Sequence, residues 1–148
     1  MNGSQRPAEV GTTNRLKVMI DMDGVLCDYM TGYDEGIIDN SHQPYPQSNF
    51  GFFTNLKPIK DAIESFRILE NNFDVYILTR PSTKNLMCYS EKAGWVRDNL
   101  GNHVLENLII CCDKSLVKGD YLIDDMVDHG QPDFEGKHIH FGTDRFPD

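Results

Sequence analysis

Five short apolar segments, each followed at once by polar residues, constrain the fold of this chain more than any other feature of its sequence. They span residues 16–20, 75–78, 108–112, 121–123 and 138–141. Short segments that are apolar at nearly every position are typical of strands buried on both faces. The spacing between them leaves room for helices. The pattern therefore predicts a parallel sheet rather than an antiparallel one.

Helical spacing of apolar side chains predicts two helices between these strands. The first begins at Pro58, a residue that suits the first turn of a helix. Its predicted buried side chains are Ile59, Ile63, Phe66 and Leu69. The second is capped by Ser82 or Thr83, ends at Gly101, and buries Leu86, Ala93, Val96 and Leu100. This alternation predicts an α/β fold, with a Rossmann-like parallel sheet of about five strands and helices on both faces.

Residues 28–57 interrupt the alternation directly after the first strand. They contain six aromatic residues among Gly, Pro, Asn and Ser, with little periodicity. An insertion at this point overhangs the carboxyl edge of the sheet, so we interpret it as a small cap. The expected organisation is a flexible tail (1–14), a core (15–27 and 58–148) and the cap (28–57).

The charge balance limits the possible partners. The chain has 14 Lys and Arg against 23 Asp and Glu, a net charge of −9. This negative field repels long nucleic acids and anionic membrane surfaces, so neither is expected as a partner. No apolar segment approaches the roughly 18 residues of a membrane span. The four cysteines form no C-x-x-C pair, which favours a reducing, cytoplasmic location over a disulfide scaffold.

Polar side chains stand at the ends of the first four apolar segments. They are Asp21, Asp23, Thr79, Arg80, Lys114, Asp124 and Asp125. The carboxyl ends of parallel strands meet at one edge, where α/β sheets bind ligands. Crowded carboxylates favour a hard cation such as Mg²⁺, while Thr79 and Lys114 suit phosphate oxygens. One carboxylate can accept a phosphoryl group and a second can transfer protons, so the cluster predicts phosphoryl transfer.

The order of these residues resembles the four motifs of the haloacid dehalogenase superfamily. More narrowly, the chain resembles the 5'(3')-deoxyribonucleotidases between Val18 and Asp125. The shared features include Asp21-Met22-Asp23-Gly24, Phe52-Phe53 before Leu56-x-Pro58, Thr79-x-Pro81, Glu91-Lys92-x-x-Trp95-Val96, Asp113-Lys114 and Leu122-Ile123-Asp124-Asp125. The resemblance implies a Mg²⁺-dependent phosphatase that works through an aspartyl-phosphate intermediate.

The resemblance also implies a role for each residue of the site. Asp21 would be the nucleophile and Asp23 the general acid and base. Mg²⁺ would bind to Asp21, the main-chain carbonyl of Asp23 and a carboxylate of the Asp124-Asp125 pair, either of which can be the direct ligand. Thr79 and Lys114 would bind phosphoryl oxygens. Three further candidates are Tyr29 and Phe53 against a nucleobase and Lys92 near the phosphate.

The sequence departs from the family at two places. Arg80 stands where the family usually has a small hydroxyl residue, so it either adds a phosphate contact or pairs with an acid elsewhere. The insertion is shorter than the usual cap, which puts nucleotide preference in question but leaves phosphoryl chemistry unaffected.

Three functions remain in competition. The first is hydrolysis of a small phosphomonoester, above all a deoxyribonucleoside monophosphate. The second is a related phosphatase for a sugar, cofactor or polynucleotide-end phosphate. The third is a receiver-like phospho-acceptor module, which the order of the motifs disfavours because Asp124 and Asp125 follow Lys114. His138 and His140 lack a third ligand at zinc-like spacing and are interpreted as edge-strand residues. The oligomeric state stays open.

Overall fold

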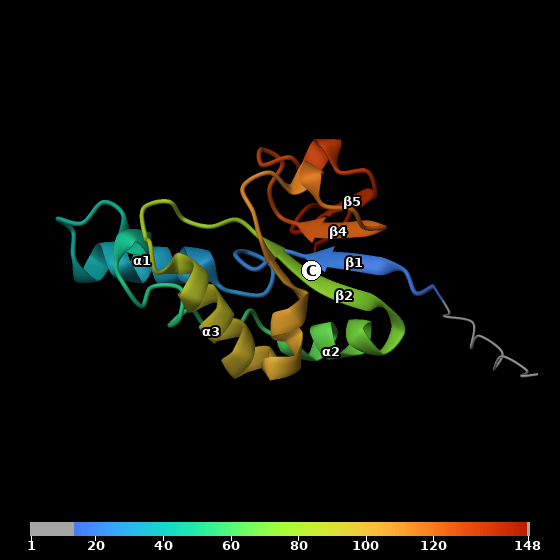
Figure 1. Ribbon diagram of the computed structural model, residues 1–148. Coiled ribbons are helices and arrows are strands. Elements are labelled where there is room, and N and C mark those ends of the chain that lie inside the picture. Colours follow the sequence, from blue (N-terminus) through green and yellow to red (C-terminus); the bar gives the residue numbers. More distant parts are fainter. Residues whose placement is uncertain (1–13, 148) are drawn as a thin grey trace, which may run out of the picture.

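The computed structural model describes residues 14–147. Their fold is built around a five-stranded parallel sheet (Figure 1). The strands are β1 (Lys17–Ile20), β2 (Asp74–Thr79), β3 (Leu108–Ile110), β4 (Tyr121–Asp124) and β5 (Lys137–His140). Their order in the sheet is β3-β2-β1-β4-β5, and all pairs are parallel. The predicted α/β fold and all five strands are confirmed.

Helical segments cover both faces of the sheet, but unequally. The helices are α1 (Tyr29–Asp39), α2 (Ala62–Asn72) and α3 (Cys88–Leu100), with 3-10 helices η1 (Pro46–Ser48), η2 (Asn102–Asn107), η3 (Lys114–Leu116) and η4 (Gln131–Asp133). Phe66 of α2 and Trp95 of α3 join one hydrophobic cluster with Ile20 of β1, so both helices pack against the same face. On the opposite face, Phe134 packs beside Leu122, directly after the short helix η4.

Both helices begin later than the sequence predicts. Asp61 adopts a left-handed φ of 62°, which breaks the helical path and delays α2 to Ala62. Pro58, the predicted first residue, instead bridges to Cys27. The predicted cap of α3 at Ser82 or Thr83 is also wrong. The helix begins at Cys88, and Leu86 is 86% exposed because the chain before it forms an irregular loop.

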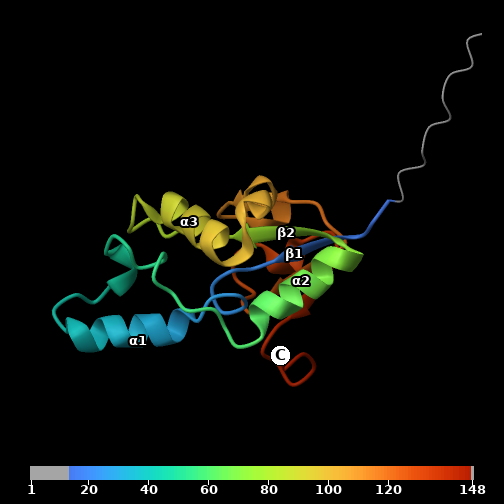
Figure 2. The same ribbon diagram turned by 90° about the horizontal axis from the view of Figure 1, so that it is seen from below.

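The insertion after β1 is closed at its base and lies beyond the carboxyl ends of the strands. The Asp28 amide donates to the Lys57 carbonyl at 2.8 Å, and the Ile59 amide donates to the Leu26 carbonyl at 2.9 Å. Both views place α1 past the end of the sheet (Figures 1 and 2). The division into core and cap stays a prediction, and residues 1–13 of the predicted tail lie outside the described residues. No helix in residues 14–147 has the length and hydropathy of a membrane span.

Candidate active site

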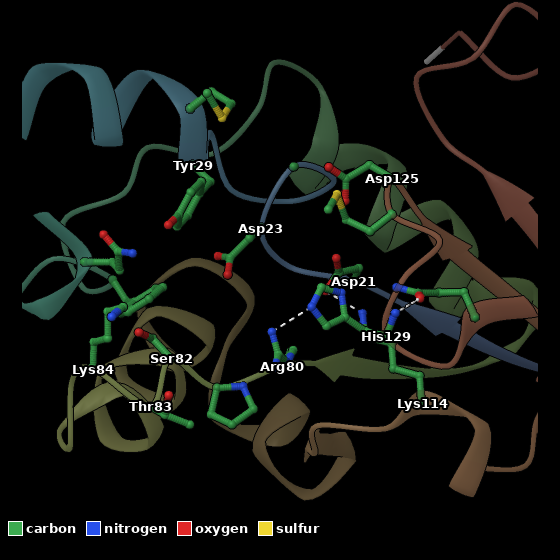
Figure 3. Close-up of a pocket in the computed structure, with 17 residues that line it drawn as sticks. Asp21, Asp23, Tyr29, Arg80, Ser82, Thr83, Lys84, Lys114, Asp125 and His129 are labelled. Carbon is green, nitrogen blue, oxygen red and sulfur yellow. Dashed lines mark hydrogen bonds and ion pairs between the residues drawn. The ribbon is translucent and has the colours of Figure 1, made fainter. Parts of the chain in front are cut away.

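A cavity of about 440 Å³ lies at the carboxyl ends of β1, β2 and β4. Charged side chains line one end of it, and Figure 3 shows Asp21, Lys114 and Asp125 there. Tyr29 and Lys84 lie toward the other end (Figure 3). Small-molecule sites typically enclose about 300–1,000 Å³. The cavity therefore has the size of a small-ligand site, with Asp21, Lys114 and Asp125 at one end and Tyr29 and Lys84 toward the other.

Asp21 is fixed at the end of β1 and paired with a buried lysine. Its amide continues the sheet by donating to the Ile123 carbonyl at 2.9 Å. Its Oδ1 lies 2.9 Å from Lys114 Nζ, which also hydrogen bonds to Asp124. Burial raises the pKa of Asp21 to about 7, with Lys114 opposing this rise and nearby carboxylates adding to it. Burial alone would lower the pKa of Lys114, but Asp21 and Asp124 outweigh it and raise that pKa.

Asp21 also belongs to a group of three converging carboxylates. Asp21, Asp124 and Asp125 each offer an oxygen within 4.8 Å of the others. Oδ1 of Asp125 is buried without a hydrogen-bond partner among the described residues. Burial, with Asp124 beside it, raises the pKa of Asp125. Clustered oxygen ligands with one unpartnered carboxylate fit a hard divalent cation such as Mg²⁺.

The turn after β1 requires a glycine beside these acids. Gly24 has a φ of 82°, a conformation that side chains with a Cβ rarely adopt. A Cβ at this position would lie 2.1 Å from Asp125 Oδ2. Gly24 therefore lets the turn approach the carboxylate closely, which brings the two strand ends together.

Lys92 is fully buried behind the cavity and joins two of the predicted site residues. Its Nζ lies 2.8 Å from Asp23 Oδ2 and 2.7 Å from Thr79 Oγ1. The same ammonium lies 4.9 Å from the centre of the Phe53 ring. The second oxygen of Asp23, Oδ1, is buried without a partner among residues 14–147. Lys92 thus holds Asp23 by one oxygen and leaves the other available to a ligand.

Glu91 attaches the insertion to the core. Its carboxylate accepts hydrogen bonds from the amides of Gly51 at 2.7 Å and Phe53 at 3.1 Å. The buried Asn85 amide donates to the same carboxylate. Sequence reasoning gave Glu91 no role, although it lies on the same side of α3 as Cys88 and Trp95. The helical spacing of Glu91 from Cys88 and Trp95 is the one sequence signal that could have placed it on the buried face.

We expect Glu91→Ala to destabilise the protein because the amides of Gly51 and Phe53 lose their acceptor. A buried donor left unpaired costs roughly 1–3 kcal/mol, so the free energy of unfolding should fall by at least about that amount. Urea unfolding measures it. Glu106→Ala, which removes an exposed carboxylate just after α3, is the matched control and should change stability little. Equal stability of the two variants would contradict this role for Glu91.

Arg80 lies on the cavity wall and contacts a histidine. Its Nη1 is 2.6 Å from His129 Nε2, and His129 Nδ1 is 2.7 Å from Asp128 Oδ1. The backbone of His129 is tied to the site because its carbonyl accepts from the Lys114 amide at 2.9 Å. His138 and His140 instead contact the main-chain carbonyls of Asp124 and Asp125. This agrees with their interpretation as edge-strand residues.

The structure brings most of the predicted site residues to the cavity wall. Those that line it are Asp21, Asp23, Tyr29, Phe53, Arg80, Lys114 and Asp125. Thr79, Lys92 and Asp124 are fully buried behind this wall, where they hold the lining residues in place. Sequence reasoning missed Gln47 and His129, which also line the cavity. No pattern distinguished either residue from an ordinary loop residue.

Comparisons with known proteins identify the family of the chain. The family model described as "5' nucleotidase, deoxy (Pyrimidine), cytosolic type C protein" matches residues 38–145, more than half of the chain. The "Putative 5'(3')-deoxyribonucleotidase" of Vibrio phage KVP40 is 40% identical over 143 residues, which cover 95% of this chain and 84% of the relative. The human cytosolic-type 5'(3')-deoxyribonucleotidase is 31% identical over 141 residues, which cover 74% and 70% of the two chains.

The fold, the strand-end acids and these relatives all lead to one assignment. The resemblance that the motifs indicated is confirmed, as is the prediction of a phosphoric monoester hydrolase of the nucleotidase type. The chain belongs to the 5'(3')-deoxyribonucleotidase family.

Proposed function

We propose that this protein hydrolyses deoxyribonucleoside 5'- and 3'-monophosphates, with Mg²⁺, through a phosphoryl group carried by Asp21. The observation that carries the proposal is the cluster of Lys114 with three carboxylates, Asp21, Asp124 and Asp125, at one end of the cavity. The rings of Tyr29 and Phe53 line the same cavity and suit the flat face of a nucleobase. Family membership supports the same substrate class.

The proposed first step transfers the phosphoryl group to Asp21. Oδ1 of Asp21 accepts from the Met22 amide at 2.8 Å and from Lys114, so Oδ2 is the attacking atom. As the new oxygen–phosphorus bond forms, the bond from phosphorus to the nucleoside oxygen breaks. Asp23 gives that oxygen a proton from its unpartnered Oδ1. Lys92 keeps this carboxyl in place through its other oxygen.

The second step releases phosphate. Asp23 Oδ1 removes a proton from water, the water oxygen attacks phosphorus, and the bond to Asp21 breaks. Lys114 and Arg80 would bind the phosphoryl oxygens, and His129 holds the Arg80 guanidinium on the cavity wall. Thr79 would act through Lys92, since its hydroxyl is engaged there. Mg²⁺, held by Asp21, the Asp23 carbonyl and the Asp124-Asp125 pair, would offset the charge of the phosphoryl group.

The proposed location is the cytoplasm. Cys27, Cys88, Cys111 and Cys112 are all free thiols in the structure. Four thiols in one small domain are typical of a reducing compartment.

A substrate panel tests the proposed function. Phosphate release from dUMP, dTMP, their 3' isomers, p-nitrophenyl phosphate, deoxyribose 5-phosphate and glucose 6-phosphate is measured with Mg²⁺ and with EDTA. We expect kcat/KM for the nucleotides to exceed that for the sugar phosphates by at least about tenfold, because only nucleotides fill both ends of the cavity. Equal or greater activity on sugar phosphates would contradict the nucleotidase proposal. A long-lived acyl phosphate without turnover would indicate the receiver-like module instead.

We expect Mg²⁺ to stabilise the protein more strongly as the pH rises. In the metal-free protein the pKa of Asp21 is raised from 3.8 to about 7, so folding becomes less favourable as pH rises through this interval. Mg²⁺ requires ionised carboxylates, so the gain in Tm on adding Mg²⁺ should grow between about pH 5.5 and about pH 8. Differential scanning fluorimetry measures it. In Asp21→Asn the gain should be smaller and should depend less on pH, whereas a gain that does not change with pH in the parent would contradict the assignment.

A further inference from the structure

Gln47 carries a polar atom that the protein leaves without a partner. Its Oε1 is buried and has no hydrogen-bond partner among the described residues, although Gln47 lines the cavity. Two other buried side-chain oxygens share this property, on Asp23 and Asp125. The proposed reaction uses both of those carboxylates, but it has no role for Gln47. Because burying an unpaired amide oxygen is unfavourable, a ligand that brings a donor would gain by binding there.

The position of Gln47 separates it from the phosphoryl end of the cavity. It belongs to η1, whose first residue, Pro46, packs so closely on α1 that a Cβ at Gly36 would lie 2.6 Å from it. On the other side, Lys84 Nζ lies 3.9 Å from the centre of the Tyr45 ring, directly before η1. Figure 3 shows Lys84 at the end of the cavity opposite Lys114. Gln47 therefore lies between α1 and the loop that carries Lys84, on the side of the insertion.

The surroundings of this amide suit a flat ring with a polar edge. Tyr29 and Phe53 line the same cavity with their ring centres 6.4 Å apart and their planes inclined by 32°. Aromatic faces offer apolar contact to a heterocycle, and the amide of Gln47 offers an acceptor beside a donor. Glutamine amides pair with base edges through these two groups at once. Uracil and thymine present a matching N3–H beside a carbonyl, and cytosine presents an amine beside a ring nitrogen.

We propose that Gln47 is a specificity-determining residue whose Oε1 accepts a hydrogen bond from the pairing edge of the substrate's nucleobase. The inference rests on the proposed function, because it names how the nucleotide's base is recognised in the same cavity. It makes the base, and not only the phosphate and sugar, a source of transition-state binding. A substrate whose base lacks the donor leaves Oε1 unpaired and is a poorer substrate.

The test compares dTMP with N3-methyl-dTMP, which lacks the N3–H. For the parent protein we expect kcat/KM to favour dTMP by at least about tenfold. Gln47→Met keeps the length of the side chain and removes the acceptor, so the ratio should fall close to one. Gln47→Glu keeps an acceptor and should keep the preference. If Gln47→Met still prefers dTMP by the parent ratio, the bulk of the N3-methyl group causes the preference. That result would overturn the proposal.

A matched control variant and two substrates without a nucleobase distinguish failure of this inference from failure of the proposed function. Gln43, on the same segment, does not line the cavity, and its Nε2 donates to Ser48 Oγ at 2.9 Å. Gln43→Met should keep the parent ratio, and a loss of the ratio there would show that the amide of Gln47 is not the determinant. If p-nitrophenyl phosphate and deoxyribose 5-phosphate are hydrolysed but nucleotides are not, the proposed function fails. If nucleotides are hydrolysed with a ratio near one in the parent, only this inference fails.

Discussion

Asp21→Asn should lower kcat by at least about four orders of magnitude, because Asp21 is the proposed nucleophile and removal of a nucleophile typically eliminates most of an enzyme's rate enhancement. The amide cannot supply the attacking oxygen anion, while the cavity around it is unchanged. Phosphate release from dUMP with Mg²⁺ present measures the effect. The fold should survive. Asp21 is 6% exposed and burial raises its pKa to about 7, so a neutral side chain is tolerated there, and Lys114 keeps Asp124 as its partner.

Two comparisons make this result specific to position 21. Asp34→Asn removes an exposed carboxylate on α1 and should keep parent activity. Thermal unfolding of Asp21→Asn without metal should show a Tm at least equal to that of the parent at neutral pH. Activity of Asp21→Asn within about tenfold of the parent would mean that another group is the nucleophile.

Lys114→Met should produce the largest loss of stability. Lys114 is 2% exposed and pairs with both Asp21 and Asp124, so its removal leaves two buried carboxylates without their cation. Breaking a buried ion pair by removing one partner costs about 3–5 kcal/mol. We expect the free energy of unfolding in EDTA to fall by about that amount near pH 8, as measured by urea unfolding. Turnover should also be lost, since Lys114 is proposed to bind the phosphoryl oxygens.

Two further variants distinguish the effect of unpaired carboxylates from a change in packing at position 114. Lys118→Met, at an exposed position four residues further on, is the control and should change little. The double variant Asp21→Asn with Lys114→Met should be more stable than Lys114→Met alone, because one of the two unpaired charges is gone. If the second substitution instead added to the loss, repulsion between unpaired carboxylates would not be the cause.

The sheet and the convergence of the strand-end residues at the candidate site could be predicted from the sequence because both depend on short-range patterns. A buried parallel strand is apolar at almost every position, so its end at Asp21 or at Asp124 is visible in the sequence. The carboxyl ends of such strands share an edge, which places these acids together without any knowledge of the loops. The order of the motifs then indicated the family.

Several features could not be predicted because they depend on tertiary contacts. Helix α1 buries no residue fully, and its close approach to the rest of the insertion is made at glycines, so it shows no apolar stripe. The start of α3 depends on the buried Asn85, whose amide is held by Glu91. Burial of Lys92 depends on partners that come from β2 and from the turn after β1. A charged residue on a helix is ordinarily expected at the surface. The burial of Glu91 and Lys92 is explained only by the partners that the folded protein brings to them.

The covalent step on Asp21 is the central claim, and a single-turnover experiment tests it most directly. Asp23→Asn, which should slow the release of phosphate from Asp21, is mixed with Mg²⁺ and dUMP carrying a radioactive phosphate, then quenched in acid. We predict label bound to the protein, released by hydroxylamine as an acyl phosphate would be, and located on the peptide that contains Asp21. The label should be absent when Asp21 is also replaced by Asn. Turnover of dUMP by the parent, with no labelled protein in either the parent or Asp23→Asn, or with label on another peptide, would contradict the mechanism.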